Sequence, residues 1–181
     1  GPKRSMYAVA AGLEPRLFDP SGHFGPFSPF EFIGPPPATP LGEGDLLQGG
    51  TGELLLNEWV AADLQAKIGD TIRLKYNLMG SHGELNETDR LFTLRGILKL
   101  KGTAADDRGL TPDVPGITDA KSLVSWRQPF PMKTKLITKR DEEYWTAYRA
   151  TPKIFLSLKS AQHLWKTRYG DLTSIRYAPI P

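Results

Sequence analysis

The sequence predicts an α+β fold in which a mixed sheet carries long irregular loops. Residues 71–78 alternate strictly between polar and apolar side chains, which is typical of a half-buried strand. Residues 57–69 instead place apolar side chains at helical spacing. Glycine and proline are unevenly distributed, since nine of each fall within residues 1–50 and no proline lies between Leu41 and Thr111. We therefore expect an irregular first part followed by a regular body.

The composition excludes several classes of protein. Of the 181 residues, 39% are hydrophobic, which is enough for a core and excludes wholesale disorder. The net charge of +3 comes from interleaved acids and bases. The dense basic stretch 133–140 runs directly into the acidic residues 141–143, so we expect no nucleic-acid partner. The absence of cysteine excludes a disulfide framework, a thiol nucleophile and a cysteine-based zinc site.

Two further features concern the origin of the chain. No run approaches the roughly 18 apolar residues of a membrane span, and no signal peptide is visible. The Gly1-Pro2 start resembles a protease scar. We therefore expect residues 1–5 to be a leader, and residues 6–181 to be one domain cut from a longer chain.

The first fifty residues predict one strand and a long loop. The apolar run 6–13 is typical of a buried strand that ends near Gly12 and Pro15. Residues 17–50 alternate phenylalanine with turn-forming residues, and their proline density excludes helix. Because a bare linker has no use for phenylalanine, we expect aromatic side chains to pin this loop over the core. An exposed docking surface for another protein is the alternative.

The middle of the chain predicts a strand, a helix and a hairpin. Residues 53–56 form the strand, and Asn57 caps a helix that we expect to end at Gly69. The alternating strand then pairs with an antiparallel strand at 91–100, in which Gly96 forms a bulge.

The last part of the chain predicts another irregular stretch and a β-α-β unit. Residues 101–131 contain four prolines, and a loop of this length is usually functional or held down by contacts. Helices are expected at 141–150 and 160–169, and strands at 153–158 and 172–177. Two strands joined by a helix should lie parallel in one sheet.

Few side chains suggest chemistry. The three histidines, His23, His82 and His163, lie far apart in the sequence. Neither a nucleophile motif nor a phosphate-binding loop with its Lys-Ser/Thr is present. The acids at 141–143 are explained by the preference of a helix N-terminus for negative charge. Three of the four tryptophans fall on predicted helices among apolar neighbours, so we expect them in the core.

The densest group of loop acids is the strongest catalytic candidate. Asp106, Asp107 and Asp113 stand near Arg108, and their oxygens are suitable for a hard cation or for a hydrolase. They lack the ordered spacing of an EF-hand. We favour the simpler interpretation that acid–arginine pairing holds this loop in place.

Several motifs of the chain resemble one family of membrane proteins. The turn Ala66-Lys67-Ile68-Gly69-Asp70-Thr71 and the strand Phe92-Thr93-Leu94-Arg95-Gly96-Ile97-Leu98 are similar to the extracytoplasmic (periplasmic core) domain of MacB-like, or FtsX-like, ABC transporter permeases. The later stretches resemble one bacterial subgroup of large FtsX-like permeases; they are 104–117, Trp126 with Pro129-Phe130-Pro131, 141–145, 148–149, 151–153 and 170–176. The resemblance covers most of residues 54–177, while residues 14–50 match nothing.

The resemblance implies a fold and a role. Such domains combine a βαβ porter-like part, here residues 6–56 and 150–178, with an inserted β-rich part, here 57–149 with its long loop 101–131. They lie outside the bacterial cytoplasmic membrane, between the first and second transmembrane helices of the permease. The family therefore implies a non-catalytic, periplasmic domain that needs no cofactor or metal and that couples ATPase-driven movement to a substrate or partner. It also implies that the two ends of the domain meet on one side of the fold.

The implied partners are the transmembrane part of the permease, a cytoplasmic ABC ATPase, and an extracytoplasmic protein or lipid-linked substrate. The candidate contact or loop-anchoring residues are Phe24, Phe27, Phe30, Asp107, Arg108, Trp126 and Phe130. Two alternatives remain open. One is a secreted hydrolase that uses the loop acids, and the other is a free-standing carbohydrate- or peptide-binding module with an aromatic platform at Trp126 and Phe130.

Overall fold

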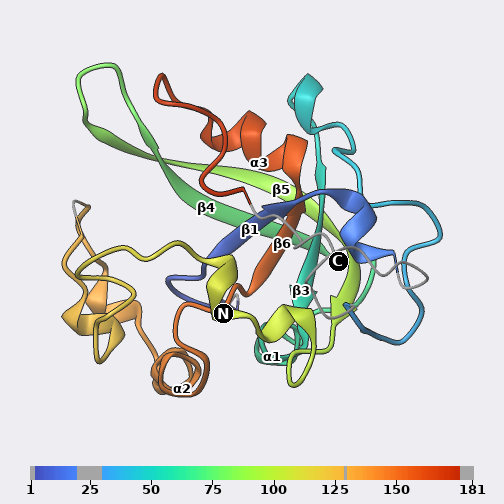
Figure 1. The fold of residues 1–181 in the computed structure, drawn as a ribbon, viewed down its shortest axis with the longest axis horizontal. Coiled ribbons are helices and arrows are strands. Elements are labelled where there is room, and N and C mark those ends of the chain that lie inside the picture. Colours follow the sequence, from blue (N-terminus) through green and yellow to red (C-terminus); the bar gives the residue numbers. More distant parts are fainter. Residues whose placement is uncertain (1–2, 20–29, 129, 176–181) are drawn as a thin grey trace, which may run out of the picture.

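The computed structural model describes residues 3–19, 30–128 and 130–175, and it contains one mixed sheet of six strands. The strand order is β1-β6-β3-β5-β2, and β4 pairs with β5 outside this order (Figure 1). The strands are β1 (Ala10–Leu13), β2 (Phe32–Ile33), β3 (Gly52–Asn57), β4 (Thr71–Met79), β5 (Leu85–Leu98) and β6 (Ile154–Ser157). The described α-helices are α1 (Glu58–Leu64), α2 (Lys139–Tyr148) and α3 (Leu158–Trp165). The predicted α+β class is confirmed.

The sheet joins segments from both ends of the described chain. β1 runs parallel to β6, with Ala10 beside Ile154. β6 is antiparallel to β3, and β3 in turn is parallel to β5. The long β4–β5 hairpin projects from the sheet as an arm, while α2 lies at the opposite end (Figure 1).

Alternating side chains of the central strands build a core on each face of the sheet. Leu55 and Phe155 point to one cluster, which loop residues such as Phe18, Phe30 and Leu41 cover. Residues 54, 56, 154 and 156 point to the other cluster, together with side chains of α1 and α3. The strands are therefore buried on both faces, which explains their nearly continuous apolar sequences.

The first helix begins where the sequence predicts and ends early. The Asn57 side chain accepts a hydrogen bond from Val60 N at 2.9 Å, as an N-cap does. Gln65 then adopts a left-handed conformation (φ 54°), so the predicted end at Gly69 is wrong. Gly69 instead starts the entry into β4, because its N–H donates to Leu94 O at 2.8 Å and pairing with β5 draws the chain away.

The hairpin is confirmed and is longer than predicted. β5 begins at Leu85 instead of residue 91, which leaves only residues 80–84 as the connection. A bulge lies one residue from the predicted position at Gly96, but in the parallel pairing of β5 with β3 and not in the hairpin. Leu54 pairs with Leu94 and Leu55 with Gly96, so Arg95 is the extra residue of the bulge.

Two predicted strands need correction. The strand expected at 172–177 is absent from residues 172–175, and residues 176–177 lie outside the described ranges. The parallel neighbour of β6 is therefore β1, so the expected C-terminal β-α-β unit is wrong over its described part. The strand expected at 6–13 is shortened to Ala10–Leu13, because Tyr7 has a positive φ of 52° that is incompatible with extended pairing.

The aromatic side chains of the first loop pin it to the core, as predicted. The rings of Phe18 and Phe30 lie 5.0 Å apart, and each contacts Phe155, at 6.2 and 5.8 Å. The candidate residues Phe24 and Phe27 lie outside the described residues. The last six residues also lie outside them, so the expected meeting of the two ends stays a prediction. No helix in the described ranges is long and apolar enough to cross a membrane.

Candidate functional site

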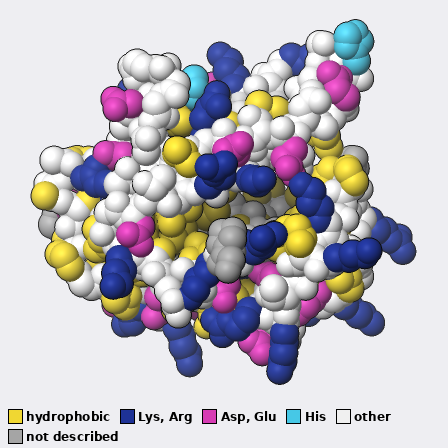
Figure 2. Space-filling model, turned by 180° about the vertical axis from the view of Figure 1, so that it is seen from behind, with side chains coloured by type: hydrophobic (Ala, Val, Ile, Leu, Met, Phe, Trp, Pro, Cys, Tyr) yellow, Lys and Arg dark blue, Asp and Glu magenta, His cyan; other side chains and the backbone are white. Residues whose placement is uncertain are grey.

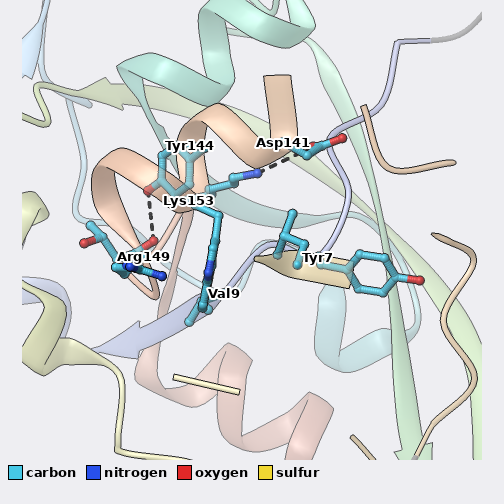
Figure 3. Close-up of a pocket in the computed structure, with 9 residues that line it drawn as sticks. Tyr7, Val9, Asp141, Tyr144, Arg149 and Lys153 are labelled. Carbon is cyan, nitrogen blue, oxygen red and sulfur yellow. Dashed lines mark hydrogen bonds and ion pairs between the residues drawn. The ribbon is translucent and has the colours of Figure 1, made fainter. Parts of the chain in front are cut away.

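A small cavity lies between the N-terminal segment, α2 and β6 (Figure 3). Its volume of about 10 Å³ is large enough for one molecule of the size of water. Aromatic, charged and apolar side chains from several elements line it; they are Tyr7, Val9, Leu123, Asp141, Tyr144, Trp145, Arg149, Thr151 and Lys153.

The most unusual residue of the cavity is Lys153, which is only 2% exposed. Its Nζ donates to Ser5 Oγ at 2.8 Å and lies 3.8 Å from Asp141 Oδ1. The ammonium also lies over the rings of Tyr144 and Trp59, at 4.6 and 5.2 Å from their centres. Burial lowers the pKa of Lys153 to about 8, against the opposing attraction of Asp141.

Asp141 is fully buried at the start of α2. Its Oδ2 accepts hydrogen bonds from the backbone N–H and the hydroxyl of Thr138, both at 2.8 Å, in a capping box. Its Oδ1 accepts the N–H of Met6 at 2.8 Å. The helix-terminus interpretation of this acid is confirmed, and the structure adds a second role, because Asp141 also anchors the segment before β1.

Tyr144 links α2 to the sheet. Its hydroxyl donates to Thr151 O at 2.9 Å and accepts from Asn57 Nδ2 at 2.9 Å. Burial raises the pKa of Tyr144, so the phenol stays neutral. The same Asn57 amide donates to Pro152 O at 3.0 Å, so one side chain connects β3, α1, α2 and the chain entering β6.

Backbone strain is concentrated around this cavity. Tyr7 and Arg149, which both line it, have positive φ angles of 52° and 54°. Such conformations in residues other than glycine store strain and persist only where surrounding contacts enforce them. Arg149 Nη1 donates to Ala120 O at 2.8 Å, which holds the long loop against α2. Thr151 Oγ1 is buried in the cavity wall and has no hydrogen-bond partner within the described ranges.

The predicted aromatic residues Trp126 and Phe130 lie beside the cavity in one cluster. The Tyr7 ring is 5.9 Å from that of Trp126 and 6.4 Å from that of Phe130. Trp126 also contacts Trp145 at 5.1 Å. Both predicted residues are only half-exposed, so they serve here as loop anchors packed on Tyr7 and do not form the open platform that a free-standing binding module requires.

The loop acids are not drawn into the cavity. Asp107 Oδ1 accepts the N–H of Gly109 at 2.8 Å and caps a 3₁₀ turn. Arg108 Nη2 donates to Ala147 O at 3.1 Å, so it fixes the loop to α2 as a loop-anchoring residue should. Asp113 is exposed, and none of the three acids lines the cavity.

Metal-binding groups are also missing from the described ranges. No group of three or more His, Asp or Glu side chains there could hold a metal ion. His82 lies in the β4–β5 turn and His163 on the exposed side of α3, while His23 falls outside the described residues.

The sequence did not point to the two residues whose bonds hold the N-terminal segment at the cavity, Lys153 and Ser5. Lys153 stands at the start of a predicted strand, where a lysine alone does not indicate a functional site. Ser5 lies in the predicted leader. Their importance depends on Asp141, which is more than a hundred positions away from Ser5 along the chain. Chemically, the ammonium and the carboxylate neutralise one another, so this arrangement suits anchoring better than proton transfer.

Neither a protein-family model, a curated protein nor a solved structure matches this chain.

Proposed function

We propose that this chain is the non-catalytic extracytoplasmic domain of a MacB-like, or FtsX-like, ABC transporter permease, which couples ATPase-driven movement of transmembrane helices to a substrate or partner outside the cytoplasm. The observation that carries the proposal is the parallel pairing of β1 with β6. In such a domain the porter-like part is built from both ends of the segment. Here Ala10–Leu13 and Ile154–Ser157 lie side by side, and the hairpin of β4 and β5 is inserted between them along the chain.

The distribution of charge supports a role without nucleic acid. Figure 2 shows Lys and Arg side chains interspersed with Asp and Glu on the face that it presents. Surface ion pairs also join opposite charges in the described chain, such as Lys99 with Glu31 at 2.9 Å and Lys133 with Glu87 at 2.7 Å. A mixed surface of this kind offers no basic track for a phosphate backbone.

The geometry of the candidate residues supports a structural role over a hydrolytic one. The acids that a hydrolase would use lie outside the cavity, and Asp107 caps a turn. Within the cavity, the lysine and the carboxylate are bonded to the N-terminal segment and to α2. The partners in this proposal are therefore the permease's own transmembrane helices, a cytoplasmic ABC ATPase, and a protein or lipid-linked substrate outside the membrane.

The proposal is tested by finding on which side of the cytoplasmic membrane the domain lies. The 181 residues contain no cysteine, so a single thiol introduced among them reports its own accessibility once any cysteine elsewhere in the reading frame is replaced by serine. We would place Ser81→Cys, at the exposed β4–β5 turn, in the intact reading frame expressed in bacteria, and treat spheroplasts with a membrane-impermeant maleimide. The expected result is labelling of intact spheroplasts, together with membrane spans before and after this segment and a neighbouring ATPase gene.

The matched control is Ser160→Cys, which is fully buried on α3. It should be labelled only after denaturation, which shows that reactivity follows the folded domain. Labelling of Ser81→Cys only after the membrane is broken, or a reading frame without flanking spans, would overturn the proposal.

A further inference from the structure

The segment Ser5–Val9, here called the strap, contacts several parts of the molecule that are distant in sequence. At its start, Ser5 and Met6 are bound by Lys153 and Asp141. At its end, Val9 O accepts the N–H groups of Lys153 and Ile154 at 3.0 and 3.3 Å. The strap thus lies across the junction of α2 and β6 before it enters β1, and the cavity lies beneath it (Figure 3).

The middle of the strap holds part of the long loop, residues 126–128 and 130–137, here called the aromatic loop. Tyr7 Oη accepts the N–H of Lys133 at 2.6 Å. The Tyr7 ring also packs on Trp126 and Phe130. One strap residue therefore supplies both a hydrogen bond and the aromatic contacts that position this loop.

The aromatic loop has little core of its own. The hydrophobic cluster beside it contains three buried residues, Leu123, Trp145 and Ala150, to which Tyr7 and Trp126 add partly buried rings. A region with so few buried apolar contacts depends strongly on each one and opens at low free energy.

The present arrangement of the aromatic loop leaves polar atoms unsatisfied. Trp126 Nε1 and Gln128 Oε1 are both buried without a hydrogen-bond partner among the described residues. An arrangement that leaves such atoms without protein partners is less stable than one that pairs them. The strained φ of Tyr7 acts in the same direction. The strap contacts at Tyr7 therefore offset part of the free energy that these unpaired atoms cost.

We propose that the strap couples movement at the start of the chain to the conformation of the aromatic loop. When Ser5 and Met6 are displaced from Asp141 and Lys153, Tyr7 moves and releases the loop. This release changes the exposure of Trp126 and Phe130 at the protein surface. The source of that displacement rests on the proposed function, in which the chain before the strap continues into a moving transmembrane helix. The coupling itself is a property of this chain and is tested on it directly.

Hydrogen exchange of the 181-residue chain, followed by mass spectrometry, tests the coupling. Tyr7→Phe removes the acceptor for Lys133 N and keeps the ring, so the Lys133 amide should exchange about fivefold faster. The decisive variant is Ser5→Ala, because the hydroxyl of Ser5 bonds Lys153 and Asp141, and its hydrogen-bond partners among the described residues include none in the aromatic loop. It should accelerate exchange across residues 126–137, while β3 and β5 keep their protection.

Matched variants separate the coupling from general destabilisation. Ser5→Thr retains the hydroxyl and should restore slow exchange, and Tyr169→Phe changes an exposed tyrosine (76%) and should have no effect. Unchanged exchange of residues 126–137 in Ser5→Ala would overturn the coupling, and so would equal acceleration in β3 and β5. Neither result depends on sidedness, so failure of the labelling experiment and failure of the coupling are distinguishable.

Discussion

At the scale of single residues, the central feature is the buried pair of Lys153 and Asp141. Taking both charges out of water is unfavourable, and their attraction offsets that loss only with good geometry and additional hydrogen bonds. Asp141 has these from Thr138 and Met6. The 3.8 Å separation of Lys153 from Asp141 is long for a direct bond, and the ammonium relies also on Ser5 and two aromatic rings. Desolvation accordingly dominates and lowers the pKa of Lys153.

This lowered pKa predicts a pH dependence of stability. Below pH 8 the folded and unfolded chains both hold the lysine proton, so the penalty of burying the charge is present in full. Between the folded pKa of about 8 and the ordinary value of 10.5, the unfolded chain holds more protons, so the free energy of unfolding rises with pH. We expect Lys153 to contribute a rise of about 2 kcal/mol between roughly pH 7.5 and 9.5, measured by urea denaturation.

Two substitutions identify the source of that rise. Lys153→Met should lower stability, because it leaves Asp141 buried without a counter-charge, and should remove the rise with pH. Lys159→Met, at an exposed position of α3, should preserve it. The measurement stops below pH 10 because the raised pKa values of Tyr144 and Tyr76 reduce stability above that point. A rise that persists in Lys153→Met would contradict the assignment.

At the scale of secondary-structure elements, the closest packing is that of β1 against α3. A side chain at Gly12 would overlap the Cβ atom of Ala161. The edge strand can therefore lie beneath the helix only because one residue has no side chain and the other has a single methyl group. This contact packs one face of the outer strand of the sheet directly against α3.

Gly12→Ala should destabilise the chain by about 2 kcal/mol, because it forces α3 away from β1. Ala161→Gly alone should cost about 1 kcal/mol through its effect on the helix. The double variant Gly12→Ala with Ala161→Gly restores the space, so its loss should be well below the sum of the two single losses. Thermal and urea unfolding measure all three. Simple additivity would show that the two positions are not in contact.

At the scale of the whole molecule, the sheet is continuous across both expected parts of the domain. β3 lies between β6 and β5, so the porter-like residues and the hairpin share one set of backbone hydrogen bonds. Asn57 and Tyr144 join the same regions through side chains. The two main hydrophobic clusters both include contacts with Trp59.

This continuity predicts a single cooperative unfolding transition. Far-UV circular dichroism reports the whole chain, whereas a variant that keeps only Trp165 reports the hairpin arm, where the indole contacts Tyr76 at 5.5 Å. A variant that keeps only Trp145 reports α2. Within each variant, the fluorescence and dichroism midpoints should coincide in urea. Separate midpoints would show that the inserted part unfolds as an independent domain.

Sequence patterns determined the local elements of this protein. The alternation at residues 71–78, the capping side chain of Asn57 and the acidic start of α2 each act within a few positions, so periodicity and capping were sufficient to predict the hairpin, α1 and α2. Family membership, function, partners and location remain proposals, supported by motif resemblance and by the arrangement of the strands.

Only the tertiary structure decided which elements meet. The parallel neighbour of β6 proved to be β1 instead of the expected C-terminal strand, and Gly69 was drawn out of helix by its bond to Leu94. Ser5, Asp141 and Lys153 meet at the cavity beneath the strap, although no motif or periodicity in the sequence connects them. The physical reason is that strand pairing and the burial of a charge depend on groups from separate parts of the chain, more than a hundred positions apart for β1 with β6 and for Ser5 with Asp141. Periodicity and capping depend only on immediate neighbours.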